Sequence, residues 1–355
     1  MKMTAPHIEI ATLGLFILDT FEWRTASSSS STTSASSPVV IKRDEGVIGG
    51  GGTYAIMGAR IWLPPRRVGI LVDRGKDWDP AIEAKLGGYG NDMWVYRDKQ
   101  GETTKALNLY TGEHREFKYL TERTRLEPRD LPAPFRRSRF LHFVCSPTRA
   151  ATIRAQLLDA RENPTPTWQP DLVYEPIPDR CVPEELDALR NVLPDVRIFS
   201  PNHEEAGSFF GIAPDETARR GPRGVEEVAK RFIDEGAKDV VVIRSGAWGA
   251  YVLRRGRDPG FWVPAYYPYD DREAQVKVVD VTGAGNSFLG GLMAGLVLYP
   301  DDLEKAVQCA SVSASFIIEQ FGLPLVSTDA AGVELWNGSS PSARLEQLRG
   351  RVRRK

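Results

Sequence analysis

A glycine-rich turn in the last third of the chain carries the residues best suited to chemistry. The run Val279–Gly291 reads VDVTGAGNSFLGG, and an apolar stretch, Val276–Val279, leads into it. We expect this stretch to be a strand that passes through the turn into an apolar helix. Gly283 and Gly285 allow close approach of a ligand to the backbone, and the free N–H groups of the helix start would form an anion hole for phosphate. The alternative is a glycine-rich corner that binds nothing.

Polar residues at two other places suit a phosphate-transfer site. Asp19 ends the run LGLFILD, where a carboxylate at a strand end could bind neighbouring hydroxyl groups of a sugar. Taken alone, Asp19 would equally be a turn or helix-cap residue. Asn202 and Glu205 stand three apart at a helix start, on one face, where they could organise water bound to Mg²⁺. The same pair fits a helix capping box, and the two roles are compatible.

Three other classes of site fail on spacing. The run GILVDRGKD from Gly69 imitates a Walker phosphate loop, but Asp77 stands where a hydroxyl must bind Mg²⁺ and the glycines are one residue too far apart. The run Gly49–Gly52 is not the G-x-G-x-x-G turn of a dinucleotide-binding fold. The pair His203–Glu204 does not extend to the H-E-x-x-H pattern of zinc proteases.

The apolar pattern of the chain supplies elements that would hold these residues in place. Short β-rich runs alternate with helical patterns, which is typical of βαβ units and a mostly parallel sheet in an α/β protein. We expect strands at Ile8–Leu13, Val68–Val72, Phe140–Cys145, Asp171–Tyr174, Val196–Phe199 and Asp239–Ile243. We expect helices near Ala55–Trp62, Arg149–Arg161, Pro183–Val192, Gly224–Glu235, Ala284–Leu298 and Asp301–Gln320.

Two internal regions and the C-terminus depart from this alternation. Residues 26–37 form a Ser/Thr-rich tract, which we expect to be a flexible insertion between strand-like flanks at Phe21–Arg24 and Val39–Arg43. The region Met93–Tyr119 alternates like antiparallel strands, so these pieces predict a small β-sheet inserted into the core. The basic C-terminal run RLEQLRGRVRRK is expected to be a solvated, frayed helix end; the alternative is a contact with nucleic acid or an anionic surface.

Composition narrows the classes of protein. The 355 residues include 46 Lys+Arg and 47 Asp+Glu, so the chain lacks the basic surplus of a nucleic-acid binder, and phosphate affinity should come mainly from backbone N–H groups. A hydrophobic content of 41% excludes an acidic disordered protein. Three scattered cysteines form neither a disulfide framework nor a zinc motif. No apolar run is long enough to span a bilayer, so we expect a cytoplasmic protein without a membrane partner.

Taken together, the motifs resemble the pfkB, or ribokinase-like, family of carbohydrate and nucleoside kinases. The turn at 279–291 resembles the family's C-terminal signature, and the run from Ile48 to Arg60 resembles its first one. The resemblance covers residues 8–326 and implies a ribokinase-like three-layer α/β/α sandwich with a small inserted β lid, formed by segments at about 20–48 and 93–119. Residues 327–355 would be a C-terminal extension. The variants SPNHEEA, YEPIP and GGGGTYA look most like a fungal, maintenance-of-killer-type branch.

The resemblance also implies roles for single residues. The substrate-binding positions would be Asp19, Gly50, Gly51 and Thr53, the last of which replaces an asparagine usual in the family. The ATP-binding positions would be Asn202, Glu205, Gly246, Gly249, Thr282 and Ser311, with Glu205 also reaching a metal through water. The catalytic turn would be Gly283, Ala284, Gly285 and Asn286. ATP and Mg²⁺ are the implied cofactors, with a monovalent cation left open. The implied partner is a sugar-like small molecule, and a homodimer through the lid is left open.

Asn286 is the departure that matters most. The family has an aspartate there, which accepts the proton of the attacking hydroxyl. An amide oxygen accepts a hydrogen bond but takes no proton at neutral pH, and loss of a general base typically costs ~10²–10⁴-fold in rate. Two functions therefore stay open: phosphoryl transfer from ATP to a sugar or nucleoside hydroxyl, impaired by Asn286, or a weak or inactive pseudokinase that acts as a ligand-binding scaffold or interaction protein.

Overall fold

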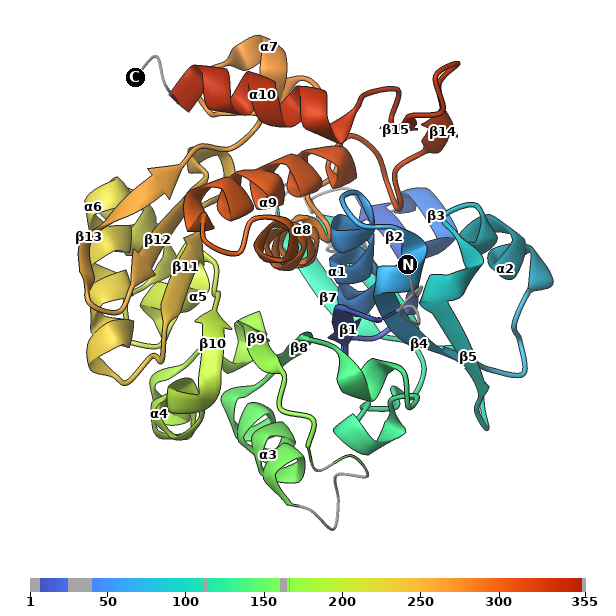
Figure 1. The fold of residues 1–355 in the computed structure, drawn as a ribbon, viewed down its shortest axis with the longest axis horizontal. Coiled ribbons are helices and arrows are strands. Elements are labelled where there is room, and N and C mark those ends of the chain that lie inside the picture. Colours follow the sequence, from blue (N-terminus) through green and yellow to red (C-terminus); the bar gives the residue numbers. More distant parts are fainter. Residues whose placement is uncertain (1–6, 25–39, 112–113, 160–164, 166, 353–355) are drawn as a thin grey trace, which may run out of the picture.

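A nine-stranded sheet runs through the middle of the molecule (Figure 1), in the order β13-β12-β11-β10-β9-β8-β1-β4-β5. The computed structural model describes residues 7–24, 40–111, 114–159, 165 and 167–352. The strands from β5 to β11 in this order are parallel, whereas β12 and β13 extend the sheet antiparallel. Their bounds are β1 Ile10–Thr12, β4 Val68–Arg74, β5 Trp94–Asp98, β8 Phe140–Cys145, β9 Asp171–Pro176, β10 Val196–Phe199, β11 Val240–Arg244, β12 Ala250–Arg254 and β13 Arg257–Val263.

Helices cover both faces of this sheet, as Figure 1 shows. In β11, Val240 and Val242 face one helix layer and Val241 and Ile243 face the other, the continuous apolar pattern of a strand buried on both sides. The first layer holds α1 Gly51–Arg60, α2 Pro80–Gly87, α7 Arg272–Gln275, α8 Ala284–Leu298, α9 Leu303–Ile317 and α10 Pro341–Val352. The second holds α3 Pro147–Leu158, α4 Leu186–Val192, α5 His203–Ser208 and α6 Pro214–Asp234. The three-layer α/β/α sandwich and the six expected parallel strands are confirmed.

A small second sheet, in the order β3-β2-β6-β7, is inserted into this frame. Its bounds are β2 Ile17–Arg24, β3 Val40–Gly49, β6 Lys105–Thr111 and β7 His114–Tyr119. The hairpin partners are antiparallel, but β2 and β6 pair parallel, with Leu18 opposite Lys105. The expected Ser/Thr-rich insertion, 26–37, lies outside the described residues. A third sheet pairs β14 Val326–Thr328 with β15 Glu334–Trp336.

Two sequence expectations about strands are wrong. The first part of Met93–Tyr119 does not belong to the small sheet, because β5 pairs with β4 at the edge of the large sheet. An edge strand and a lid strand both bury one face, so both alternate with a period of two residues. The stretch Val276–Val279 is not a strand: Val276 ends α7 with 83% of its surface exposed, and Val279 is 51% exposed.

The basic C-terminal segment is packed rather than frayed. Helix α10 lies on the outer side of α9 (Figure 1), and its own residues Leu345 and Leu348 are buried against the core. Arg344 is only 5% exposed, since its Nη2 lies 2.8 Å from Glu319 Oε1 and its Nη1 donates to Ser315 Oγ at 2.9 Å. The expectation of a solvated helix end is therefore wrong up to residue 352; residues 353–355 lie outside the description. None of the helices in the described ranges is both long and apolar enough to cross a membrane.

Substitution of Leu348 tests this packing. We expect Leu348→Ala to lower the free energy of unfolding by about 2–5 kcal/mol, because it opens a cavity between α9 and α10. The control Glu346→Ala changes an exposed residue of the same helix and should stay within about 0.5 kcal/mol of the parent. Urea unfolding measures both values. Equal values for the two variants would show that α10 is not held against the core.

Candidate active site

The start of α8 meets the carboxyl edge of the parallel sheet. Gly283 adopts a left-handed conformation, φ 79°, as the residue before α8, and a Cβ there would lie 2.3 Å from the ring of Tyr54. Glycine is therefore required at this position both for its conformation and for space. The turn directs the free N–H groups of the helix start, with their partial positive charge, toward the strand ends.

A buried ion pair lies directly beneath this helix start. Arg244, at the end of β11, places Nη1 2.9 Å from Oε1 of Glu175, near the end of β9. Nη2 of Arg244 donates to the Ser200 carbonyl at 3.1 Å. A Cβ on Gly285 would lie 1.7 Å from Arg244 Nη1, so the guanidinium occupies the space that a side chain at 285 would need. Gly285 therefore allows the ion pair to reach under the helix.

Asn286 is hydrogen-bonded to the same carboxylate. Its Nδ2 donates to Glu175 Oε2 at 2.7 Å, which leaves Asn286 Oδ1 to accept a hydrogen bond from another group. His142 Nε2 lies 3.6 Å from Glu175 Oε2, and its Nδ1 lies 3.0 Å from Thr12 Oγ1. Burial raises the pKa of Glu175, but Arg244, His142 and Asn286 together hold that pKa below its ordinary value. Glu175 is therefore an ionised carboxylate at neutral pH.

A cavity of about 410 Å³ lies on one side of the α8 start. Among the residues proposed from the sequence, its walls hold Asn202, Gly246, Gly249, Ala284, Gly285 and Ser311. Val278, Val281 and Phe288 add apolar surface, and Ser311 Oγ donates to the Pro264 carbonyl at 2.9 Å. The cavity thus combines glycine turns, an apolar wall and a helix N-terminus. An apolar wall suits the base of a nucleotide, and a helix N-terminus suits its phosphate chain.

Glu205 lies behind this cavity rather than in its wall. It forms the expected capping box: Asn202 N donates to Glu205 Oε2 at 2.7 Å, and Glu205 N donates to Asn202 Oδ1 at 2.8 Å. Burial raises the pKa of Glu205 to about 7, against the opposing effects of Arg244 and the Asn202 N–H. Within the described residues, the carboxylate is contacted by Asn202 N and Arg244 Nη2, both at Oε2, which leaves Oε1 for water. This arrangement fits a water-mediated contact with Mg²⁺, an ion that keeps several waters of its own.

The neighbouring Thr282 and Asp280 form a separate small cluster. Thr282 does not line the cavity; its hydroxyl donates to Asp280 Oδ1 at 2.9 Å and its N–H donates to the same oxygen at 3.1 Å. Oδ2 of Asp280 is buried and has no hydrogen-bond partner among the described residues. An unpartnered carboxylate oxygen fits the monovalent cation that the sequence left open.

The expected substrate residues are not gathered around one cavity. Gly51 lines a second cavity, of about 170 Å³, whose wall shares no residue with that of the larger one. Asp19 is instead buried in the small sheet, where its Oδ1 accepts from Asn108 Nδ2 at 3.0 Å. Thr53 is fully buried, and its hydroxyl has no hydrogen-bond partner in the described chain. Gly50 has φ 96°, and a Cβ there would lie 2.4 Å from the Leu15 carbonyl oxygen.

Sequence reasoning missed the polar group at the centre of the site. It consists of the ion pair of Glu175 and Arg244, together with His142 and Thr12. Each lies in, or at the carboxyl end of, a strand of the large sheet. The signal was present in the runs FLHFVC, LVYEP and VVVIR, where one polar residue interrupts an apolar strand. A polar side chain in such a strand must be paired, and pairing across strands depends on the sheet order, which the sequence does not state.

The fold and this site define a ribokinase-like protein with a nucleotide-sized cavity at the start of a glycine-preceded helix. The family model for pfkB carbohydrate kinases matches residues 82–329, and the chain belongs to that family. The chain is 33% identical over 312 residues to protein MAK32 of Saccharomyces cerevisiae, with 82% of each chain covered. It is 28% identical over 360 residues to the uncharacterized protein C16C9.01c of Schizosaccharomyces pombe, covering 98% of this chain and 94% of that one. These relatives fit the fungal MAK32-like branch expected from the motifs.

A solved structure supports the fold. Ribokinase of Arabidopsis thaliana, solved in complex with ribose and ATP, superposes with a TM-score of 0.61 at 12% sequence identity, covering 96% of this chain and 99% of that one. At that identity the likeness shows the shared fold alone.

The raised pKa of Glu205 predicts a pH dependence of stability. Because the folded protein binds this proton more tightly than the unfolded chain, the stabilisation is present below pH 4.5 and is lost as pH rises through about 7. The free energy of unfolding of the parent, relative to Glu205→Gln, should fall by up to about 3 kcal/mol between pH 4.5 and 8. Gln keeps the capping box, so the comparison isolates the charge.

Denaturant titrations at several pH values measure this difference. The matched control is Glu204→Gln, which removes the same charge from the exposed neighbouring residue. Because Glu204 makes only a minor contribution to the raised pKa of Glu205, this variant should change the slope far less than Glu205→Gln does. Parallel pH profiles for the parent and Glu205→Gln would contradict the raised pKa.

Proposed function

We propose that this protein transfers the γ-phosphoryl group of ATP to a hydroxyl group of a small sugar-like acceptor. The observation that carries the proposal is the hydrogen bond from Asn286 Nδ2 to the ionised Glu175, at a helix start that lines the larger cavity and lies beside Gly51 in the wall of the smaller one. The larger cavity would hold ATP and the smaller one the acceptor. The family's name as carbohydrate kinases and the ribose–ATP complex of the Arabidopsis ribokinase support this assignment.

ATP fits the larger cavity with its phosphate chain at the start of α8. Ala284 and Gly285 line the cavity there, and the helix dipole favours negative charge at that end. The apolar wall that includes Phe288, Ala314 and Ile318 suits the base. Mg²⁺ bound to the nucleotide would neutralise charge on the phosphates, and Glu205 would hold one of its waters. The buried Asp280 Oδ2 would hold a monovalent cation.

Glu175 takes over the role that an aspartate at 286 has in the family. Asn286 Oδ1 accepts a hydrogen bond from the acceptor hydroxyl and orients it. As the phosphoryl group transfers, Oδ1 takes the hydroxyl proton while Nδ2 releases a proton to Glu175 Oε2, so the amide relays the proton without keeping it and the carboxylate receives it. The bond between the acceptor oxygen and the γ-phosphorus forms as the bridging bond to ADP breaks. Because this transition state is loose, positioning carries most of the catalysis and a carboxylate of lowered pKa suffices.

A second function, a nucleotide-binding scaffold without turnover, is favoured by Asn286 itself. An amide at 286 takes no proton, and in this alternative Glu175 would serve only to hold Arg244 beneath α8. Both functions require ATP to bind the larger cavity. They differ in whether removal of the Glu175 charge changes turnover.

Two further expectations from the family resemblance are kept as proposals. We propose that two copies pair through the small sheet, which the exposed apolar side chains of Val40, Ile41 and Phe117 on its outer strands support. We also propose the cytoplasm as the compartment, which the free cysteines support: Cys181 and Cys309 are buried and Cys145 is partly buried.

Exchange of charge between positions 175 and 286 tests the catalytic proposal. Glu175→Gln should lower kcat by about 10²–10⁴-fold with ATP affinity nearly unchanged, because it removes the proton acceptor. Asn286→Asp alone should not raise kcat, since it sets two carboxylates in contact and one of them then keeps a proton. The double variant Glu175→Gln/Asn286→Asp carries one carboxylate again and should recover activity relative to Glu175→Gln.

The measurements are ATP·Mg²⁺ calorimetry and an ADP-release assay with a panel of sugars, nucleosides and their phosphates. Full activity in Glu175→Gln would contradict the role of Glu175. Tight ATP binding without product from the parent or the double variant would establish the scaffold instead. Absence of ATP binding would refute both functions.

A further inference from the structure

The smaller cavity adjoins the reaction centre and holds an unusual set of charges. It lies beyond the carboxyl ends of β1 and β8, with Gly51 in its wall. A Cβ on Gly51 would lie 3.2 Å from Asn286 Nδ2, so the same glycine touches both the cavity and the catalytic asparagine. A molecule in this cavity therefore has one end beside Asn286. With about 170 Å³, the space suits a metabolite smaller than the drug-sized ligands of typical pockets, at ~300–1,000 Å³.

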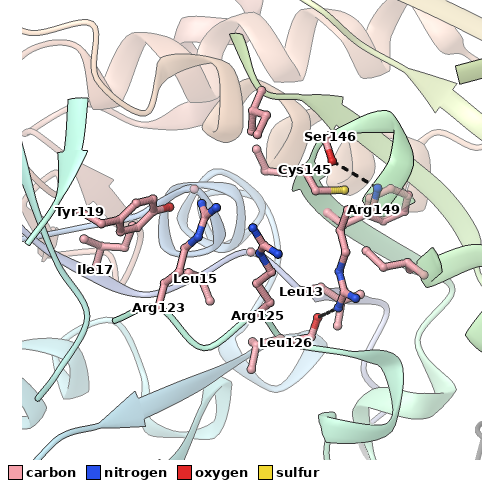
Figure 2. Close-up of a pocket in the computed structure, with 16 residues that line it drawn as sticks. Leu13, Leu15, Ile17, Tyr119, Arg123, Arg125, Leu126, Cys145, Ser146 and Arg149 are labelled. Atoms are coloured by element: carbon pink, nitrogen blue, oxygen red, sulfur yellow. Dashed lines mark hydrogen bonds between the residues drawn. The ribbon is translucent and has the colours of Figure 1, made fainter. Parts of the chain in front are cut away.

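Three arginines reach into this cavity from two directions, as Figure 2 shows. Arg123 and Arg125 come from the segment that follows β7, and Arg149 comes from the first turn of α3. Within the described ranges, the wall contains no aspartate or glutamate. Because the whole chain is nearly neutral, this cluster is a local feature rather than a reflection of composition.

The arginine charges are only partly balanced by the protein. Arg149 Nη2 donates to the Leu126 carbonyl at 3.2 Å, and its Nη1 lies 3.4 Å from Glu127 Oε1, a carboxylate that Arg129 also binds at 2.6 Å. Arg123 stacks over the ring of Tyr119, with Cζ 4.6 Å from the ring centre.

Neither Arg123 nor Arg125 has a carboxylate within ion-pair distance in the part of the chain that the structure describes. Like charges gathered without counter-charge repel one another, so the cluster favours an anion from outside.

The remaining polar groups of the wall do not supply that anion. Burial raises the pKa of Cys145 to about 12 despite the nearby Arg149 and Arg125, so Cys145 is a neutral thiol. Ser146 is the residue before α3, and its Oγ accepts from the Arg149 N–H at 3.2 Å, which leaves its own hydroxyl hydrogen to donate. The hydroxyl and the helix start add further attraction for negative charge.

We propose that the acceptor of this kinase is a small polyol that already carries a phosphate monoester, bound by Arg123, Arg125 and Arg149. A guanidinium group binds a phosphate through two parallel hydrogen bonds. The double negative charge of a phosphate monoester balances two arginines that lack a carboxylate partner better than a single carboxylate would. The free hydroxyl of the acceptor then lies at the Gly51 end, beside Asn286. This assignment of the substrate class rests on the proposed kinase function.

The reaction implied by this substrate balances without another reactant. The γ-phosphorus of ATP loses its bond to the bridging oxygen of ADP and gains one to the acceptor hydroxyl oxygen. The hydroxyl proton is relayed through the Asn286 amide to Glu175; the amide is restored when Nδ2 regains its proton from Glu175 and Oδ1 releases one to solvent. The products are ADP and a polyol with two phosphate groups.

Binding without ATP tests the substrate class separately from the kinase function. Calorimetry of the full chain would use inorganic phosphate, pentose and hexose monophosphates, sugar acids and the corresponding neutral sugars. We expect at least one sugar monophosphate to bind. Arg123→Gln and Arg125→Gln should each weaken this binding by about 10- to 100-fold, the range of one charge-assisted hydrogen-bonded pair.

The control is Arg137→Gln, which removes the same charge from an exposed residue outside the cavity and should leave sugar-phosphate binding unchanged. ATP affinity should stay within about twofold in the cavity variants, since neither arginine lines the larger cavity. Circular dichroism and thermal unfolding of each variant confirm that it is folded.

Each other outcome has a definite meaning. Tighter binding of sugar acids than of sugar phosphates would overturn the phosphate assignment, and unchanged binding of sugar phosphates in Arg123→Gln and Arg125→Gln would overturn the anionic acceptor altogether. Absence of binding by every monophosphate would also refute it. Arginine-dependent binding of a sugar phosphate without product in the ADP-release assay would refute the kinase function and leave the anion site in place.

Discussion

The ion pair between Arg244 and Glu175 is the constraint on which the site depends. Removing both charges from water carries a large penalty, which good geometry and further hydrogen bonds must offset. Here the Ser200 carbonyl satisfies the arginine and Asn286 satisfies the carboxylate. The pair also fixes what stands above it, because the guanidinium fills the space of a side chain at 285. The position of the start of α8, which lines the larger cavity, follows from this ion pair.

Six of the nine strands of the large sheet were predictable, because strands buried on both faces read as continuous apolar runs; β12 and β13 were not predicted and β5 was assigned to the small sheet. Strand β11, with Val240 to Ile243 shared between two cores, is the plainest case. The same rule gave a wrong prediction at 276–279. The apolar residues there and just after serve another purpose, because Val278 and Val281 line the larger cavity. An apolar ligand wall and a buried strand have the same composition, and only the tertiary structure separates them.

The charged part of the site could not be predicted, because its members come together from distant segments. Glu175 and Arg244 are 69 positions apart in the sequence, and a third strand, β10, lies between their strands. The balanced composition concealed the arginines in the same way. It led to the expectation that phosphate affinity comes mainly from backbone N–H groups, whereas Arg123, Arg125 and Arg149 gather at one cavity. Net charge averages over the whole chain, and binding responds to the local field.

The asparagine at 286 and the arginines of the smaller cavity become consistent when the two cavities are considered together. An aspartate at 286 would set a negative charge beside Gly51, on the side of the cavity proposed to hold the acceptor. A neutral amide keeps that wall uncharged, while the carboxylate of Glu175 lies behind it, balanced by Arg244. Such an arrangement suits an acceptor that is itself an anion, because a second negative charge at the wall would repel it. The proposed acceptor would therefore meet a neutral amide at 286 and the arginines of the smaller cavity, with the carboxylate of Glu175 one side chain farther away.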